Sequence, residues 1–198
     1  MEKYKNLISI LSGILQKNGF LKKGNTFYIK ENTNWGILNF QKSKNSTIHE
    51  VQFTINLGVS STILRKFNNE DIKQKPEIEK SHWRKRIGFL LPENKDYWWR
   101  ISRDTILEQL INDISEILIN IATPEILRHI TDKSMETEWL NDISSGITDL
   151  QRYFFLTALL KLHNDDRLPL YIEKLKLFSK GKVFEEVVIE HIRVLQGW

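Results

Sequence analysis

The chain has 198 residues, of which 40% are hydrophobic and 11% aromatic, so it can bury a core and is not expected to be disordered. Its lack of cysteine excludes disulfides, thiolate metal sites and a cysteine nucleophile, and favours a reducing compartment. No run approaches the roughly 18 consecutive apolar residues of a membrane span, and no signal-peptide pattern precedes the first amphipathic segment. We therefore expect a cytoplasmic protein, and its wealth of Lys, Asn and Ile is typical of AT-rich bacterial genomes.

The net charge of +4 conceals an asymmetry between the two halves. Residues 1–102 carry 18 Lys/Arg and 9 Asp/Glu, whereas residues 103–198 carry 11 and 16. The basic half could attract an acidic partner or nucleic acid. Alternatively, the two halves attract each other and dock, and composition does not separate these interpretations.

Helix and strand periodicities alternate along the first half. Apolar residues spaced three and four apart predict a helix over 4–15, which Asn18-Gly19 ends. Period-two alternation predicts strands over 26–31, 35–43 and 48–60, the first two forming a hairpin. A polar stretch over 61–81 is too long for an ordinary connection and is typical of segments that border a site. Strand pattern resumes over 82–91 and 97–102.

After Arg103 the apolar period is helical throughout. A stripe runs from Ile106 to Ile121, Thr123-Pro124 restarts a shorter helix, and further helices are expected over 136–143, 149–163, 169–179 and 183–195. We therefore predict an α+β fold with a five-stranded, mainly antiparallel sheet packed on one face by N-terminal and central helices. An all-helical extension follows, which divides the chain into residues 1–131 and 132–198.

The strand alternation gathers nitrogen-bearing side chains on the face of the sheet opposite the apolar one. Adjacent Trp98 and Trp99 must point to opposite faces, so one of these indoles leaves the core. The favoured interpretation is that this polar face is solvated or covered by the C-terminal helices. The alternative is a binding surface, and its candidate residues are Asn39, Gln41, Asn56, His82, Arg84, Arg86, Trp98 and Trp99.

Four segments together carry a resemblance to a known family. They are Asn39-Phe40-Gln41-Lys42-Ser43, Phe53-Thr54-Ile55-Asn56-Leu57-Gly58, His82-Trp83-Arg84-Lys85-Arg86-Ile87-Gly88 and Tyr97-Trp98-Trp99 after a proline turn. Over about residues 3–130 the chain resembles a bacterial family of domains of unknown function, numbered 4304. The resemblance implies an α+β cytosolic domain without established activity, often followed by a variable C-terminal extension. The family pattern includes a small residue or cysteine before the His-Trp pair; here Ser81 stands there, so a thiol role is absent.

No motif in the sequence dictates a reaction. The five histidines have no metal-ligand spacing, and no serine or carboxylate lies in a recognisable nucleophile setting, so we assign no catalytic residue, metal or cofactor. We therefore expect a non-catalytic protein-binding module, one version being an immunity-type protein whose acidic helices cover a toxin domain. One alternative is a nucleic-acid or nucleotide-binding protein that uses the basic, aromatic face. Another is an enzyme acting on a small anion at His82, Arg84 and Arg86.

Overall fold

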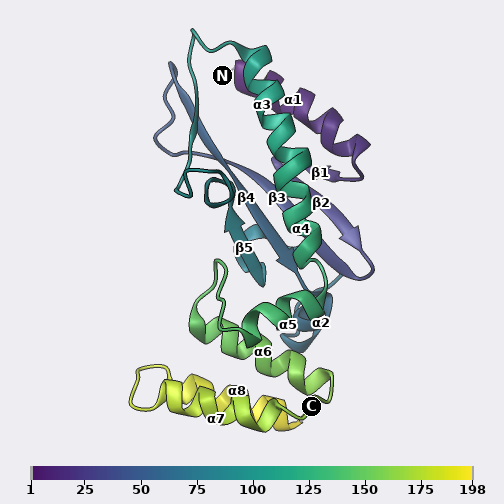
Figure 1. Ribbon diagram of the computed structural model, residues 1–198, viewed down its shortest axis with the longest axis vertical. Coiled ribbons are helices and arrows are strands. Elements are labelled where there is room, and N and C mark those ends of the chain that lie inside the picture. Colours follow the sequence, from purple (N-terminus) through teal and green to yellow (C-terminus); the bar gives the residue numbers. More distant parts are fainter. Residues whose placement is uncertain (1, 198) are drawn as a thin grey trace.

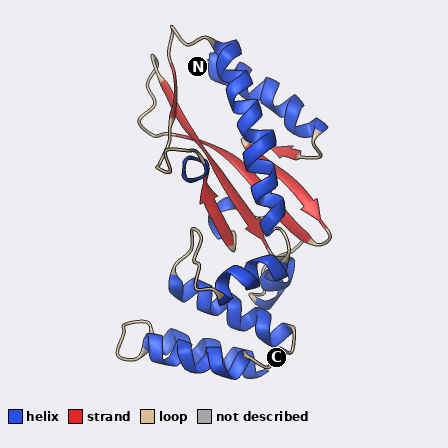
Figure 2. Ribbon diagram, in the orientation of Figure 1, coloured by secondary structure: helices blue, strands red, loops and turns tan. Residues whose placement is uncertain are grey.

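The computed structural model describes residues 2–197 (Figure 1). Its strands are β1 (Leu21–Lys23), β2 (Thr26–Glu31), β3 (Asn34–Lys42), β4 (Val51–Ser60), β5 (Trp83–Arg86) and β6 (Trp99–Ile101). Its α-helices are α1 (Glu2–Lys17), α2 (Thr62–Phe67), α3 (Leu107–Ile117), α4 (Thr123–His129), α5 (Asp132–Leu140), α6 (Asp149–Leu162), α7 (Leu168–Ser179) and α8 (Glu185–Gly197). The 3-10 helices are η1 (Ile78–Lys80) and η2 (Ile87–Leu90), and η3 (Leu118–Ala122) is a π-helical turn. Helices lie against one face of the sheet and beyond one of its ends (Figure 2).

The sheet has six strands in the order β1-β2-β3-β4-β5, all paired antiparallel, and β6 also pairs with β4. β3 runs along one edge of β4. The other edge is shared, because β6 pairs beside Val51–Phe53 and β5 beside Asn56–Val59. Residues 87–98, which connect these two short strands, must therefore loop away from the sheet at the middle of β4.

One face of the sheet forms the main core. Side chains such as Phe40 on β3 and Phe53 and Ile55 on β4 are at most 1% exposed and belong to one apolar cluster with α1, α3 and α4. These residues alternate with polar ones along each strand, which is the pattern of a sheet with one buried face. The predicted α+β class, with N-terminal and central helices on one face, is confirmed.

α3, η3 and α4 form one continuous helix rather than the two that the sequence predicts. The residues at both joints, Ile117 and Thr123, have right-handed helical backbone angles. Pro124 has no N–H to donate inside a helix, and the wider π turn before it accommodates this loss. The carbonyl oxygen of Leu118 accepts the Thr123 N–H in this π turn and also a hydrogen bond from Thr123 Oγ1 at 2.8 Å.

The C-terminal helices are attached to the sheet in layers. Trp139 of α5 and Leu159 of α6 are fully buried in the same cluster as the sheet residues. The outer hairpin of α7 and α8 packs on α6 through a second, smaller cluster centred on Leu175, Val188 and Ile192. The division of the chain after residue 131 stays a prediction, since the main core continues across that position.

The sequence does not predict β1, and β4, β5 and β6 are each shorter than predicted. β1 carries no alternation because all three of its residues are exposed, so the sequence offers no signal for it. The strand predicted over 82–91 ends at Arg86, where η2 begins, and Phe89 is exposed instead of buried. Within residues 2–197, no helix combines the length and apolar character needed to cross a membrane.

Candidate functional site

The polar face of the sheet carries the predicted amides and guanidinium groups. Strand register pairs Asn39 with Asn56, Asn56 with Arg86, and Gly58 with Arg84. Directly paired residues of an antiparallel sheet point to the same face, and Gln41 shares that face with Asn39 because the two are separated by two positions. The common face predicted for the two asparagines, the glutamine and the two arginines is confirmed, whereas a binding role for them stays a prediction.

Neighbouring side chains on this face form a chain of hydrogen bonds. The Asn56 amide nitrogen donates to Gln41 Oε1 at 2.8 Å, and Arg86 Nε donates to Asn56 Oδ1 at 3.2 Å. Arg86 Nη1 donates to Asp96 Oδ2 at 2.7 Å, and the guanidinium lies 5.3 Å from the ring centroid of Trp98. The chain orients these groups but leaves the Gln41 amide nitrogen without a partner among residues 2–197, so a ligand can accept from it.

Asp96 reduces the charge that Arg86 presents to solvent. Partial burial acts to raise the pKa of Asp96, but hydrogen bonds from Arg86 and Trp98 outweigh burial and lower that pKa below its usual value. The carboxylate is therefore ionised at neutral pH and pairs with Arg86. The neighbouring cations, Arg84 and Lys85, are less fully compensated: Lys85 Nζ lies 3.7 Å from Glu125, outside hydrogen-bonding range.

Arg84 lies between two loops. Its Nη1 donates to the carbonyl oxygen of Glu79 at 2.7 Å, and its backbone N–H donates to the carbonyl oxygen of Ser145 at 3.2 Å. Its Nε is buried and has no partner within the described chain. Arg84 is thus fixed by its neighbours but retains unused donor capacity, which is the condition for pairing with an added acceptor.

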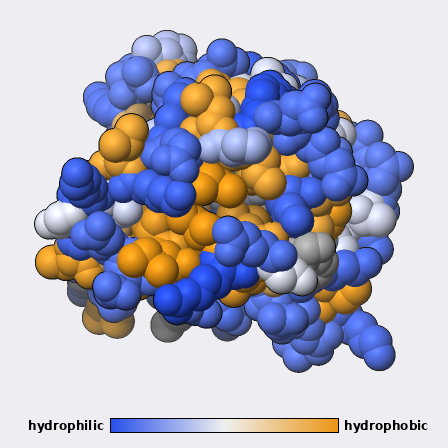
Figure 3. All heavy atoms as spheres, turned by 90° about the horizontal axis from the view of Figure 1, so that it is seen from below, coloured by the Kyte–Doolittle hydropathy of each residue, from blue (hydrophilic) through white to orange (hydrophobic). Residues whose placement is uncertain are grey.

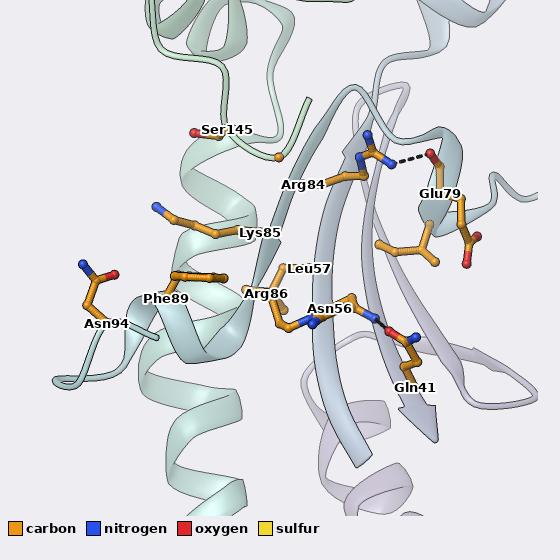
Figure 4. Close-up of a pocket in the computed structure, with 12 residues that line it drawn as sticks. Gln41, Asn56, Leu57, Glu79, Arg84, Lys85, Arg86, Phe89, Asn94 and Ser145 are labelled. Carbon is orange, nitrogen blue, oxygen red and sulfur yellow. Dashed lines mark hydrogen bonds between the residues drawn. The ribbon is translucent and has the colours of Figure 1, made fainter. Parts of the chain in front are cut away.

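These groups converge on a cleft of about 670 Å³ that crosses β5 (Figure 4). Phe89, Asn94 and Lys85 lie on one side of β5 in this view, and Gln41 and Glu79 on the other. The volume is within the range of ligand sites in proteins. The lining consists of Gln41, Asn56, Leu57, Ile78, Glu79, Arg84, Lys85, Arg86, Phe89, Asn94, Ser145 and Gly146.

Residues 61–82, which connect β4 to β5 and are called the excursion, form one wall of the cleft. A buried arginine holds this segment in place. Arg65 is 4% exposed; its Nε donates to Glu70 at 3.1 Å. Its two terminal nitrogens donate to the carbonyl oxygens of Gln74 and Asp71 at 3.1 and 2.6 Å. A buried guanidinium needs several acceptors, and here it recruits them from the loop. The excursion is therefore fixed, and it places Ile78 and Glu79 at the cleft.

The loop between α5 and α6, residues 141–148, forms a second wall. Buried Arg152 donates to the carbonyl oxygen of Trp139 at 3.1 Å and to Asp142 at 2.6 Å, which fixes the start of the loop. Gly146 has φ +69°, and an added Cβ there would lie 2.1 Å from the carbonyl oxygen of Arg84. Only glycine permits this approach to β5.

The segment between β5 and β6 forms the third wall. At the base of this loop, called its neck, the backbone at Lys95 lies directly against Gly88. A Cβ added at Gly88 would lie 2.2 Å from the carbonyl oxygen of Lys95. The Lys95 N–H donates to the carbonyl oxygen of Gly88 at 3.2 Å and closes the neck. The residues inside this closed loop, including Phe89 and Asn94, are thereby presented to the cleft.

The structure removes His82 from the candidate surface. His82 is 1% exposed, its Nδ1 accepts a hydrogen bond from the Ser61 N–H at 3.0 Å, and its ring packs against Phe155 of α6 at 4.7 Å. Burial, assisted by the charge of Arg65, lowers the pKa of His82 from 6.5 to about 3. The imidazole is therefore neutral and inaccessible, and its role is to join β5 to α2 and α6.

The two tryptophans divide as alternation requires. Trp99 is 6% exposed and stacks on Phe53 in the core, so it is also removed from the candidate surface. Trp98 is half-buried on the polar face and donates from Nε1 to Asp96 at 3.1 Å. Asn39 shares that face but donates to Thr26 at 2.8 Å and does not line the cleft.

Several cleft residues escape prediction from the sequence. Strand alternation assigns Lys85 and Phe89 to the core side of the sheet. Phe89 is exposed only because β5 ends at Arg86. Asn94, Ser145 and Gly146 lie in loops, for which periodicity carries no information. One signal was present, since a long connection often borders a site and the excursion supplies Ile78 and Glu79.

No histidine lines the cleft. His129 is 2% exposed and lies 2.6 Å from Glu138, and His191 is stacked on Phe154. His163 contacts Glu136, which is itself 1% exposed. Residues 2–197 contain no group of three or more His, Cys, Asp or Glu side chains arranged to hold a metal ion.

Comparison with protein families gives a match over more than half of the chain. Residues 11–129 match the model described as "Domain of unknown function (DUF4304)", which is more than half of the chain. The chain belongs to the DUF4304 family. No curated protein and no solved structure matches it.

The DUF4304 segment contains the whole sheet, the excursion and the continuous α3–α4 helix. It therefore includes every cleft residue except Ser145 and Gly146. The cationic floor of the cleft belongs to the family segment, while one wall is contributed by the C-terminal helices.

Proposed function

We propose that this protein is a non-catalytic protein-binding module whose cleft across β5 holds an anionic group of its partner. The observation that carries the proposal is the convergence of Gln41, Asn56, Arg84 and Arg86 with Phe89 on one cleft. Arginine beside an aromatic ring is the composition of interface hot spots. A guanidinium also matches the geometry of a carboxylate. An acidic side chain or a C-terminal carboxylate of a protein is the group that this cleft suits.

The distribution of cations supports a protein partner over nucleic acid. Strand register assigns Lys22 and Lys42 to the helix-covered side of the sheet and Lys23 and Lys30 to the polar side, so these lysines do not form one patch. Arg86 is paired with Asp96. A nucleic-acid site needs a series of cations that follow successive phosphates, whereas this cleft offers a local pair of cations among apolar groups.

The enzyme alternative lacks the accessible imidazole that it requires as an acid–base group. It depended on an imidazole beside Arg84 and Arg86, and His82 is buried under Phe155. A general acid or base must reach the proton that it transfers. The remaining polar side chains of the cleft are amides, cations, a serine and the carboxylate of Glu79, and none of them is an imidazole.

The toxin-neutralising version of the proposal gains little from the outer helices. It depended on an acidic helical surface that imitates phosphates. The hairpin over residues 168–197 carries four acidic and five basic residues, and Glu173 and Glu190 pair with Lys176 and Arg193. The acidic excess of residues 103–198 therefore lies in residues 103–167 and not in this hairpin, and we base the proposal on the cleft. Absence of cysteine supports a cytoplasmic setting for it, and composition supports a bacterial one.

Selection from a random peptide library displayed on phage tests the proposal. Peptides are selected against the wild-type protein and against Arg84→Gln, with Arg193→Gln as a control that removes an equal charge from α8. We expect wild type and control to enrich peptides that carry Asp, Glu or a free C-terminal carboxylate. We expect Arg84→Gln to lose that enrichment, because its side chain keeps amide donors but no charge.

Two outcomes would contradict the proposal. One is a selection in which the wild-type protein enriches no acidic peptides. The other is acidic enrichment that persists in Arg84→Gln or disappears in Arg193→Gln, because the cleft would then not be the binding site. A single-stranded oligonucleotide bound more tightly than the selected peptides, with a steep dependence on salt, would favour the nucleic-acid alternative.

A further inference from the structure

The α7–α8 hairpin is the part of the described chain where exposed apolar side chains are most concentrated. Six of the fifteen large apolar side chains that are exposed within residues 2–197 lie between Leu170 and Val194. Viewed from the end of the molecule formed by these helices, apolar atoms gather across the middle of the face and hydrophilic atoms surround them (Figure 3). Concentrated exposed apolar surface of this kind marks an interaction site.

The apolar residues of the proposed interface lie along one stripe of α7 and in a groove between α7 and α8. Leu170, Glu173 and Leu177 follow each other at spacings of three and four along α7, so they share a face. Leu177 is 72% exposed. Beside it, a groove of about 460 Å³ runs between α7 and α8, and its floor includes Ile189 and Ile192.

We propose that a second copy of this chain occupies the face, so that two α7–α8 hairpins pack antiparallel about a two-fold axis near Leu177. A two-fold interface requires a surface that complements itself, because each contact occurs twice with the partners exchanged. Around Leu177 the chain meets this requirement. Glu173 lies four positions before Leu177 and Lys180 three positions after it, so antiparallel packing places the carboxylate of one copy near the ammonium of the other.

Apolar groups match in the same arrangement. Leu170 lies in the first turn of α7 and Val183 in the turn that follows the end of α7 at Ser179, and both are exposed in the isolated chain. Antiparallel packing brings these side chains together at the two ends of the interface. The Leu177 side chain of each copy then enters the groove of the other, where Ile189 and Ile192 lie. Packing two hairpins in this way makes a four-helix bundle.

Charge favours a second copy over other occupants. Residues 168–197 carry four acidic and five basic residues, so two hairpins repel each other little. A lipid surface would select a predominantly basic rim around the apolar stripe, whereas Glu173 and Glu185 border this groove together with its cations. The face shares no residue with the cleft across β5, so the inference does not depend on the proposed function.

The expected dimer is weak because the face is small. A helix of 12 residues such as α7 is about 18 Å long, which places the interface at the low end of the sizes found in specific complexes. We expect a dissociation constant on the order of 10–100 μM. Sedimentation equilibrium of the full chain from about 5 to about 500 μM should therefore show a mass that rises from monomer towards dimer.

Variants distinguish this interface from others. Leu177→Asp should reduce association at least about tenfold, and circular dichroism melting should be unchanged because the side chain is exposed. Val187→Asp is the matched control, since Val187 is also an exposed residue of the hairpin but does not line the groove. Glu173→Lys and Lys180→Glu should each weaken association by about threefold to tenfold, and the double variant should restore it.

A wild-type protein that stays monomeric up to about 500 μM would overturn the inference. Equal weakening by Val187→Asp and Leu177→Asp would place the interface elsewhere. A double charge exchange that associates less than either single variant would exclude the antiparallel arrangement about Leu177. Each of these results is independent of the peptide selection that tests the cleft.

Discussion

Alternation along the strands places polar side chains on one face of the sheet. Other segments of the chain cover one end of this face and leave the other end open. At the closed end, Ser60 and His82 are at most 1% exposed beneath α2, the excursion and α6. At the open end, Gln41 is exposed, Asn56 and Arg86 are half-buried, and all three line the cleft. Alternation therefore decides which face a side chain occupies, and the segments that pack over that face decide whether it meets solvent.

The chemistry of the two ends follows from this cover. Under a complete cover, an imidazole becomes a neutral hydrogen-bond acceptor whose pKa falls to about 3. Under partial cover, a guanidinium keeps its charge and remains accessible from the cleft. Substitutions in the cover and on the open end, together with acidification, separate the effect of the cover from that of the face.

Gly146→Val should detach the loop over 141–148 from β5. A β-branched residue at φ +69° is strained, and its Cβ would overlap the carbonyl oxygen of Arg84. We expect a loss of about 4 kcal/mol in the free energy of unfolding, measured in urea. Gly181→Val is the control, because Gly181 has φ +72° but open space around it, so it should lose only about 1–2 kcal/mol. Equal losses would mean that the contact with Arg84 contributes nothing.

Arg65→Met should release the excursion that covers the closed end. The substitution removes the guanidinium but leaves Glu70 and two carbonyl oxygens without their donor, which we expect to cost about 3 kcal/mol. Hydrogen exchange should accelerate at residues 70–80 while β3 stays protected. Lys66→Met is the control on the same helix, since Lys66 is exposed. Unchanged exchange in the excursion would show that other contacts hold it.

Acidification should weaken the closed end through His82. The unfolded chain binds a proton at this residue near pH 6.5, whereas the folded protein keeps it neutral down to about pH 3. Between these values the unfolded state holds more protons, so stability present at neutral pH is lost as the pH falls. From about pH 7 to about pH 4.5, wild type should lose about 2 kcal/mol more than His82→Gln.

The glutamine oxygen can still accept from the Ser61 N–H, so the comparison isolates the proton. His191, whose pKa burial lowers to about 4, contributes to both proteins and cancels in the difference. His49→Gln, which changes an exposed imidazole, should follow wild type. Parallel stability curves for wild type and His82→Gln would contradict the inferred burial of a neutral imidazole.

Arg86→Met should have the smallest effect, because its ion pair lies at the open end. The side chains of Arg86 and Asp96 are 30% and 46% exposed, and pairs in this range contribute up to about 1 kcal/mol. We expect a loss of about 1 kcal/mol in urea unfolding. Arg100→Met on β6 should cost almost nothing, since the Arg100 side chain is 68% exposed and its Nη1 lies 3.8 Å from Glu50 Oε1. A loss near that of Arg65→Met would erase the distinction between the two ends.

Much of the fold follows from local pattern. The alternation of β4, with Phe53 and Ile55 on one parity and Thr54 and Asn56 on the other, predicts its faces and its end at Ser60, although the strand begins at Val51 and not at residue 48. The terminal helices were predicted within a few residues, because Pro and Gly mark their ends. β1 cannot be predicted from alternation because pairing alone defines it, and the helix break predicted before Pro124 does not occur because a π turn lets the helix continue through this residue.

The candidate site was predictable only as a face. Register follows from alternation, so the common side of Gln41, Asn56 and Arg86 could be derived from sequence. The burial of His82 could not, because Phe155, which covers it, is distant in the chain and lies on a helix whose docking no local pattern specifies. The same holds for Ser145 and Gly146, which reach β5 only through a tertiary contact.

The segment between the C-terminal helices α5 and α6 supplies one wall of the cleft, so a change in these helices would change the shape of the cleft. The cationic floor lies in the DUF4304 segment, and the wall at Ser145 and Gly146 lies beyond it. A chain with this sheet and another tail would retain the floor that we propose to bind an anionic group but present a differently shaped opening. Affinity and selectivity would then be encoded in separate stretches of one polypeptide, and exchange of the second stretch would redirect the protein without redesigning the first.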